Sequence, residues 1–191
     1  NMLYPLVSPE IPDFDLDRAL SNGMLPRHYT VNNASKRIQA YVGDYLQQEI
    51  RAEALTRNLS TFSRFLEVAA LSCGEMLNYN NIARECGVSA PTIKEYFSIL
   101  EDTLVGYFLP AFRKTVKRRL IHAPRFYYFD LGLTNFLLRR SKLQPGSPEY
   151  GKAFEHFIIQ ELQAWNTYAS TNHELSYWRT ASGYEVDVIL G

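Results

Sequence analysis

The sequence predicts an α+β fold dominated by helix. Several apolar runs recur at helical spacing, and four short runs rich in aromatic or β-branched residues predict strands grouped in two pairs. Hydrophobic residues make up 46% of the 191 residues and charged residues 21%, which is ordinary globular composition and excludes a disordered or fibrous chain. Aromatic residues reach 14%, so we expect cores rich in rings.

The first part of the chain predicts two helices. Pro12 followed by Asp13 or Asp15 is a helix start, and Gly23 is a plausible stop. Apolar residues then recur at helical spacing from Asn33 to about Thr56, which predicts one long amphipathic helix.

The middle of the chain predicts a helix-turn-helix. Ser60 is a good N-cap for a helix that ends near Gly74. A short helix over 80–86 and a second helix that starts at Ser89 are joined by a turn containing Gly87. The runs LVGYFLPAF and RFYYF then predict two strands that flank a basic turn. A helix-turn-helix followed by a two-stranded wing is a winged helix.

The basic turn, RKTVKRR, packs five cations into seven residues: Arg113, Lys114, Lys117, Arg118 and Arg119. On a wing, such a cluster suits contacts with nucleic-acid phosphates. The alternatives are a solvated loop or a surface that docks an acidic neighbour. The second helix argues against base recognition, because its outward residues include one cation, Lys94, against three acids.

The last part of the chain predicts a helix in DLGLTNFLLRR, a longer helix over 151–166, and a hairpin formed by LSYWRT and YEVDVIL. On a helical wheel, Phe154, Ile158 and Leu162 define an apolar arc, and Glu155 falls inside it. Ionised carboxylates are rarely buried unless they are paired or bound to metal. The alternative is a capped or snorkelling glutamate at the rim, and Glu161 also lies near this arc.

Strand alternation in YEVDVIL puts Glu185 and Asp187 on one face. Two acids two residues apart on one strand face can line a divalent-metal site. They can also simply face water.

Charge and composition narrow the classes of function. Basic and acidic residues number 20 each, which disfavours a simple polybasic nucleic-acid binder. Residues 1–59 carry 6 basic and 7 acidic side chains, residues 60–145 carry 12 and 7, and residues 146–191 carry 2 and 6. This change of sign suggests modules with different partners.

Several motifs are absent from the sequence. No G-x-x-x-x-G-K-[ST] loop for ATP and no H-E-x-x-H motif occurs, and the four histidines show no ligand spacing. Cys73 and Cys86 form no C-x-x-C pair, so we expect neither a disulfide scaffold nor a zinc site, and a cytoplasmic location fits. No apolar run approaches 18 residues and no signal peptide is evident, so we expect no membrane partner. The chain starts without Met and stops directly after a predicted strand, so we expect an excised fragment.

With these residues in place, the chain resembles the C-terminal half of prokaryotic AAA-like P-loop ATPases that end in a domain of unknown function related to restriction endonucleases. LYPLVSPEIPDFDLDRALSNGMLPRHY resembles the segment that closes the ATPase module, and YVGDYLQQEI resembles the start of the following linker helix. Leu66 to Leu109 is similar to the family's winged helix. Three further runs are similar to its nuclease-like region: RFYYFDLGLTNFLL, GKAFEHFIIQEL and LSYWRTASGYEVDVIL.

The resemblance implies three domains: a helical connector over 1–59, a winged helix over 60–129, and a partial, incomplete restriction-endonuclease-like α/β module over 130–191. It implies that Glu155 and Asp187 are the acids of an incomplete catalytic and metal site. Physically, such acids would hold Mg²⁺ while a Lys from an E-x-K strand assists the attacking water. That strand would follow Gly191 and the phosphate loop would precede Asn1, so we expect no cofactor in this chain and Mg²⁺ only in the full-length protein.

Three functions from different classes follow. The first is a non-catalytic fragment that couples the missing N-terminal ATPase module to partner or nucleic-acid binding. The second is a winged helix that binds DNA through its basic wing. The third is a metal-dependent nuclease. We expect the fragment itself to be inactive and to bind no ATP, because no segment supplies backbone amides and a Lys for the phosphates.

Overall fold

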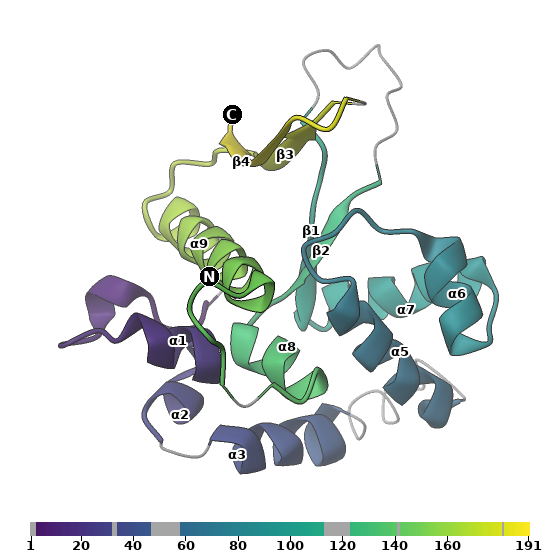
Figure 1. The fold of residues 1–191 in the computed structure, drawn as a ribbon, viewed down its shortest axis with the longest axis horizontal. Helices are drawn as coiled ribbons and strands as arrows, with labels where there is room; N and C mark the ends of the chain where they lie inside the picture. The colour runs from purple at the N-terminus through teal and green to yellow at the C-terminus, as the bar shows by residue number, and fades with distance from the viewer. Residues whose placement is uncertain (1–2, 32–33, 47–57, 113–122, 141, 181) are drawn as a thin grey trace.

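A computed structural model describes residues 3–31, 34–46, 58–112, 123–140, 142–180 and 182–191. Within these residues the protein is α+β and about half helical, with two small antiparallel sheets (Figure 1). The predicted fold class is confirmed at this level. None of the helices in the described ranges is long and apolar enough to cross a membrane.

The N-terminal elements are short. They are η1 (Ser8–Glu10), α1 (Leu16–Asn22), α2 (Pro26–Tyr29), α3 (Ala34–Ala40) and the π-helical η2 (Tyr41–Leu46). The predicted limits of α1 are confirmed, because Asp15 caps it by accepting a hydrogen bond from the Arg18 amide and Gly23 ends it with a φ of +80°. The single long helix predicted from Asn33 to about Thr56 is helical from Ala34 to Leu46, as α3 followed directly by η2, a π-helical segment that contains Gly43. Residues 47–57 lie outside the described residues.

The middle elements follow the predicted order. They are α5 (Leu59–Leu71), α6 (Tyr79–Cys86), α7 (Ala90–Asp102), β1 (Gly106–Leu109) and β2 (Arg125–Tyr128). Gly87 takes the left-handed conformation after α6, and Ser89 caps α7, as predicted. The predicted cap of α5 is wrong: Asn58, not Ser60, accepts the hydrogen bond from the Thr61 amide. β1 and β2 pair antiparallel, but the winged-helix interpretation itself stays a prediction.

The C-terminal elements are α8 (Leu131–Leu137), α9 (Pro148–Tyr168), β3 (Leu175–Arg179) and β4 (Glu185–Leu190). The predicted hairpin is confirmed, because β3 and β4 pair antiparallel with an irregularity between Ser176 and Trp178. In Figure 1 this hairpin lies above α9. It is joined to the end of the first sheet by a bridge between Ala111 and Tyr177.

Aromatic rings fill the core between α5, α6, α7 and the β1–β2 sheet. Phe97 lies at its centre, with its ring 4.9 Å from the ring of Phe65 and 4.9 Å from that of Phe126. All three side chains are fully buried. The expectation of ring-rich cores is confirmed, and edge-to-face pairs of this kind add to the stabilisation from apolar burial.

A second core joins the two ends of the described chain. Leu20 and Met24 from the α1 region pack with Leu131 of α8 and Phe157 of α9. The N-terminal elements therefore rest on the C-terminal helices rather than forming a core of their own. The domain limits predicted at residues 59 and 129 stay predictions, but residues on both sides of each limit share a core.

The buried face of α9 differs from the predicted one. The sequence predicts an apolar arc of Phe154, Ile158 and Leu162, which we expected to pack on the hairpin, but Phe154 is 42% exposed and Ile158 is 36% exposed, so this expectation is wrong. The buried residues are Ala153, His156, Phe157, Ile159, Gln160 and Ala164. This face of α9 contacts α1 and α8. Periodicity finds an apolar face, but it does not say which face a neighbour covers.

Candidate functional site

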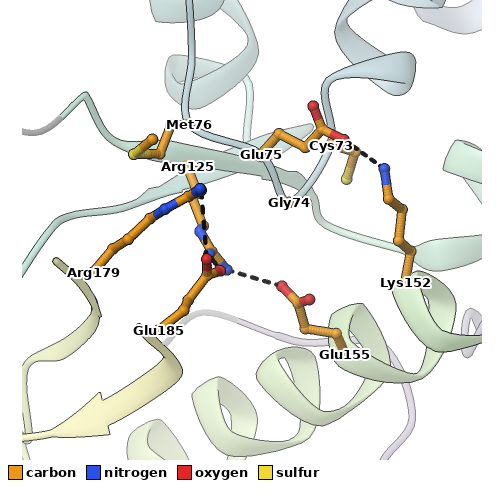
Figure 2. Close-up of a pocket in the computed structure, with 9 residues that line it drawn as sticks. All are labelled: Cys73, Gly74, Glu75, Met76, Arg125, Lys152, Glu155, Arg179 and Glu185. Carbon is orange, nitrogen blue, oxygen red and sulfur yellow. Dashed lines mark hydrogen bonds and ion pairs between the residues drawn. The ribbon is translucent and has the colours of Figure 1, made fainter. Parts of the chain in front are cut away.

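A charged pocket of about 340 Å³ opens where the loop after α5, the start of β2, α9 and the hairpin meet (Figure 2). Its lining residues are Cys73, Gly74, Glu75, Met76, Arg125, Lys152, Glu155, Arg179 and Glu185. Three cationic and three acidic side chains are among them. The pocket is therefore polar and holds charges of both signs.

Arg125 lies at the centre of these charges, although it is only 3% exposed. Its Nη1 donates to Glu155 Oε1 at 3.2 Å and lies 3.4 Å from Asp187 Oδ1, while Nη2 pairs with Glu185 Oε1. Its guanidinium carbon lies 4.6 Å from the centre of the Tyr177 ring. We call Arg125, Glu155, Glu185 and Asp187 the Arg125 cluster.

Three elements place the side chains of the Arg125 cluster. Arg125 begins β2, whose start is held by a bridge to Met76 and by a hydrogen bond from the Leu77 amide to the Pro124 carbonyl. Glu155 comes from α9. Glu185 and Asp187 come from β4, where the period of two puts both on one side of the strand, as predicted.

The structure brings the two predicted site acids together. Glu155 Oε1 and Asp187 Oδ1 both lie within 3.4 Å of one nitrogen atom, Arg125 Nη1, so they are less than twice that distance apart. This is well within the separation of about 10 Å that would exclude one shared divalent ion. Glu155 lines the pocket, whereas Asp187 lies outside the lining and its side chain is 57% exposed. Their catalytic and metal roles stay predictions.

The surroundings of Glu155 act on the pKa of its carboxyl group in opposite directions, and the net shift is upward. Burial raises the pKa of the Glu155 carboxyl and the charge of Asp187 raises it further, whereas the hydrogen bond from Tyr127 and the charge of Arg125 oppose the shift. Tyr127 donates its hydroxyl proton to Glu155 Oε1 at 2.6 Å. Burial, followed by the Glu155 charge, raises the pKa of Tyr127, so this hydroxyl stays a donor.

The arrangement does not fit a Mg²⁺ ion. A hard divalent ion needs several oxygen ligands at about 2.0–2.6 Å, and a positive charge beside it is unfavourable. Here the guanidinium of Arg125 lies between the carboxylates that would supply those oxygens. Within the described ranges, no group of three or more His, Cys, Asp or Glu side chains is arranged to hold a metal ion.

Other residues singled out by the sequence lie elsewhere. Arg113, Lys114, Lys117, Arg118 and Arg119 fall in residues 113–122, outside the described residues. Glu161 accepts hydrogen bonds from the amide and hydroxyl of Ser8 and so holds η1 against α9. Cys86 is buried in the aromatic core, as expected for a small core residue.

Cys73, which lines the pocket, contacts the buried side chain of His156. The Cys73 sulfur is 3.8 Å from His156 Nδ1, and His156 Nε2 donates to the Tyr128 carbonyl oxygen at 2.7 Å. Burial raises the pKa of the Cys73 thiol to about 11 and lowers the pKa of His156 to about 4. Both groups are therefore neutral near pH 7, which is the opposite of an activated thiolate.

Sequence reasoning missed the residues that complete the site. The sequence does not predict that Arg125, Lys152 and Arg179 meet the acids. It offers Glu185 with Asp187 as a possible metal ligand, but the resemblance does not assign Glu185 to the site. One signal was available. Arg125 opens the run RFYY, and a cation inside a strand that is buried throughout needs an acidic partner.

The family comparisons agree with part of the resemblance. Residues 13–144 match the model described as Domain of unknown function (DUF8612), and the chain belongs to this family. Residues 150–191 match Domain of unknown function (DUF4143), a domain often found at the C-terminus of AAA-like ATPases. No curated protein and no solved structure matches the chain.

Proposed function

We propose that the chain is a non-catalytic C-terminal part of an AAA-like ATPase. In this role it couples the ATPase module to a winged helix and a restriction-endonuclease-like domain that bind a partner or nucleic acid. The match of residues 150–191 supports the ATPase context. The order of α5, α6, α7, β1 and β2 supports the winged helix. The endonuclease-like relation is supported by two acids that meet at Arg125: Glu155 from a helix and Asp187 from a hairpin strand.

Asp130 is the observation that carries the coupling. Its fully buried carboxylate accepts hydrogen bonds from the Met24 amide at 2.7 Å and the Leu25 amide at 3.1 Å, and also from the Gly132 amide at 3.0 Å. The Asn135 side chain donates to the Leu20 carbonyl at 2.7 Å. The segment that resembles the end of an ATPase module is thus bonded to the helix that directly follows the β1–β2 sheet, so a displacement of one is passed to the other.

Amide hydrogen exchange tests this coupling. In Asp130→Asn, one carboxylate oxygen that accepts from backbone amides becomes a donor group, so protection should fall both at residues 24–25 and in α8. The matched control is Asp15→Asn at the exposed cap of α1, which should leave residues 24–25 and α8 unchanged, because Asn caps a helix as well as Asp does. Loss of protection at residues 24–25 with α8 unchanged would contradict the coupling.

Calorimetry and a cleavage assay test the non-catalytic part of the proposal. The purified chain should bind no Mg-ATP, because its sequence has no phosphate loop. It should also leave DNA intact in the presence of Mg²⁺ or Mn²⁺, since Arg125 lies among the acids that would hold the ion. Metal-dependent cleavage that is lost in Glu155→Gln would favour the nuclease alternative instead.

DNA binding by the winged helix is a second candidate function. The exposed side of α7 offers Lys94 but also Glu95, Glu101 and Asp102, so acids face any phosphate that approaches it. Binding should therefore be weak, steeply salt-dependent and indifferent to sequence, with contacts from the basic wing.

Fluorescence anisotropy on duplex DNA tests this candidate. Replacing Lys117, Arg118 and Arg119 by Ala should weaken binding to all sequences alike. Replacing Arg139, Arg140 and Lys142 by Ala removes the same charge beyond α8 and should have the smaller effect. A sequence preference that survives the first replacement would mean that α7 contacts bases.

A further inference from the structure

The acids of the Arg125 cluster already have a cation. One buried guanidinium contacts carboxylates from α9 and from two positions of β4. These acids differ in exposure: the side chains of Glu155 and Glu185 are 26% and 29% exposed, and that of Asp187 is 57% exposed. The cation is the most buried member at 3%, so it lies beneath the acids rather than at their solvent side.

Packing fixes Arg125 at this position. Its guanidinium lies over the Tyr177 ring, and its backbone is held in β2 opposite Leu109. If the Arg125 guanidinium moved away from the acids, it would have to enter the protein interior or pass the hairpin. Either movement would break the ion pairs or the packing around it. Lys152 and Arg179 are paired with Glu75 and Glu185, so they do not replace it.

We propose that Arg125 is the resident cation of this site, which pairs with Glu155, Glu185 and Asp187 and excludes divalent metal ions from them. A divalent ion at its ligand distances would have to displace the guanidinium nitrogen Nη1, which already lies 3.2 Å and 3.4 Å from two of the acids. The site is thus a closed ion-pair cluster. It becomes a metal site only when the guanidinium is removed.

The variant Arg125→Gln tests this directly. It leaves three acids with Arg179 as the remaining ion-pair partner of Glu185. Binding of Mn²⁺, followed by the loss of the free-ion signal in electron paramagnetic resonance, should be at least about tenfold tighter than in the wild type, since a positive charge next to a divalent ion is removed. The double variant Arg125→Gln/Glu155→Gln should lose this gain.

The matched control is Arg179→Gln. It removes an arginine that also lines the pocket but that, among the acids of the Arg125 cluster, pairs with Glu185 alone, at 3.4 Å, and its side chain is 41% exposed. It should bind Mn²⁺ no more tightly than the wild type does. An equal gain in both single variants would show a general charge effect and overturn the role given to Arg125.

Two further measurements keep the test decisive. If circular dichroism shows that Arg125→Gln is unfolded, the double variant Arg125→Gln/Glu185→Gln replaces it. This variant removes one charge of each sign. It retains Glu155 and Asp187 and should bind Mn²⁺ more tightly than the wild type does. A second measurement leaves Arg125 in place: Mn²⁺ binding by the wild-type chain that Glu155→Gln abolishes would overturn the proposal. The hydrogen-exchange test of coupling at Asp130 does not involve these residues, so the two proposals can fail separately.

Discussion

Two charged sites lie at the two ends of β2, and they hold their carboxylates by different means. Beyond the end of β2, Asp130 is fully buried and accepts hydrogen bonds from backbone amides. At the start of β2, Arg125 gathers acids that are each partly exposed and bound to it by side-chain contacts. The donors at Asp130 are backbone amides, which no substitution except to proline removes. The donor in the Arg125 cluster is one side chain, which a single substitution removes.

This difference indicates that Asp130 stabilises the fold, whereas the acids of the Arg125 cluster can be substituted with less effect on stability. Backbone amides around Asp130 are fixed by α1 and α8, and a Cβ added to Gly23 or Gly132 would collide with Asp130 Oδ1. Side chains around Arg125 face a pocket and water instead. We therefore expect substitutions at the first site to change stability strongly, and substitutions at the second to change stability little and ion binding more.

Asp130→Ala should give the largest effect. It leaves backbone amides without partners in a buried place, so the free energy of unfolding should fall by about 3 kcal/mol. Chemical denaturation measures it. The control Asp15→Ala removes an exposed cap and should cost about 1 kcal/mol. Equal losses in the two variants would remove the distinction drawn for Asp130.

His156 gives an effect of similar size that appears only in acid. Its Nε2 donates to the Tyr128 carbonyl oxygen, and burial lowers its pKa to about 4 from 6.5. The unfolded state binds the proton first, so the stability present above pH 6.5 is lost as the pH falls towards 4, by about 3 kcal/mol.

The variant His156→Gln should lack this loss. The difference between its unfolding free energy and that of the wild type, measured from pH 7 to pH 4, isolates the histidine. Asp130 contributes with the opposite sign, because burial raises its pKa to about 6 and its stabilisation is lost as the pH rises through that value. A constant difference across this range would contradict a neutral, buried His156.

Glu155→Gln should cost about 1 kcal/mol. Its amide oxygen still accepts the Tyr127 hydroxyl proton and still faces Arg125, so only the charge is lost. Urea denaturation at neutral pH measures the change. A loss as large as that of Asp130→Ala would mean that the Arg125 cluster is as structural as the Asp130 site.

Asp187→Asn should give the smallest effect, below about 0.5 kcal/mol, because its side chain is 57% exposed and salt screens such pairs. Thermal unfolding at two salt concentrations should show no difference from the wild type at the higher one. A large loss that persists in salt would place Asp187 among the structural acids.

Local signals made much of the fold predictable. The limits of α1, the turn at Gly87 and the cap at Ser89 each depend on residues within a few positions of one another. The cap of α5 was missed by two residues, since Asn58 and Ser60 are both good caps and the sequence does not rank them. The covered face of α9 was missed because apolar side chains occur on both of its sides.

The candidate site was predictable only in part. Local patterns, a charge in an apolar arc and strand alternation, make Glu155 and Asp187 candidates alongside Glu161 and Glu185, and the family resemblance selects the two. Arg125 was not predicted, because it meets them across 30 and 62 positions of sequence. Asp130 was missed for the same reason, since a buried carboxylate bonded to distant amides leaves no periodic trace.

The distance along the chain between Asp130 and its amides also affects the order of folding. The Met24 amide and the Asp130 carboxylate are separated by 106 positions. During synthesis, α1 therefore leaves the ribosome long before its polar partner exists, whereas α5, α6 and α7 can pack as soon as they emerge. Of these elements, α1 is thus made before its polar partner and docks late.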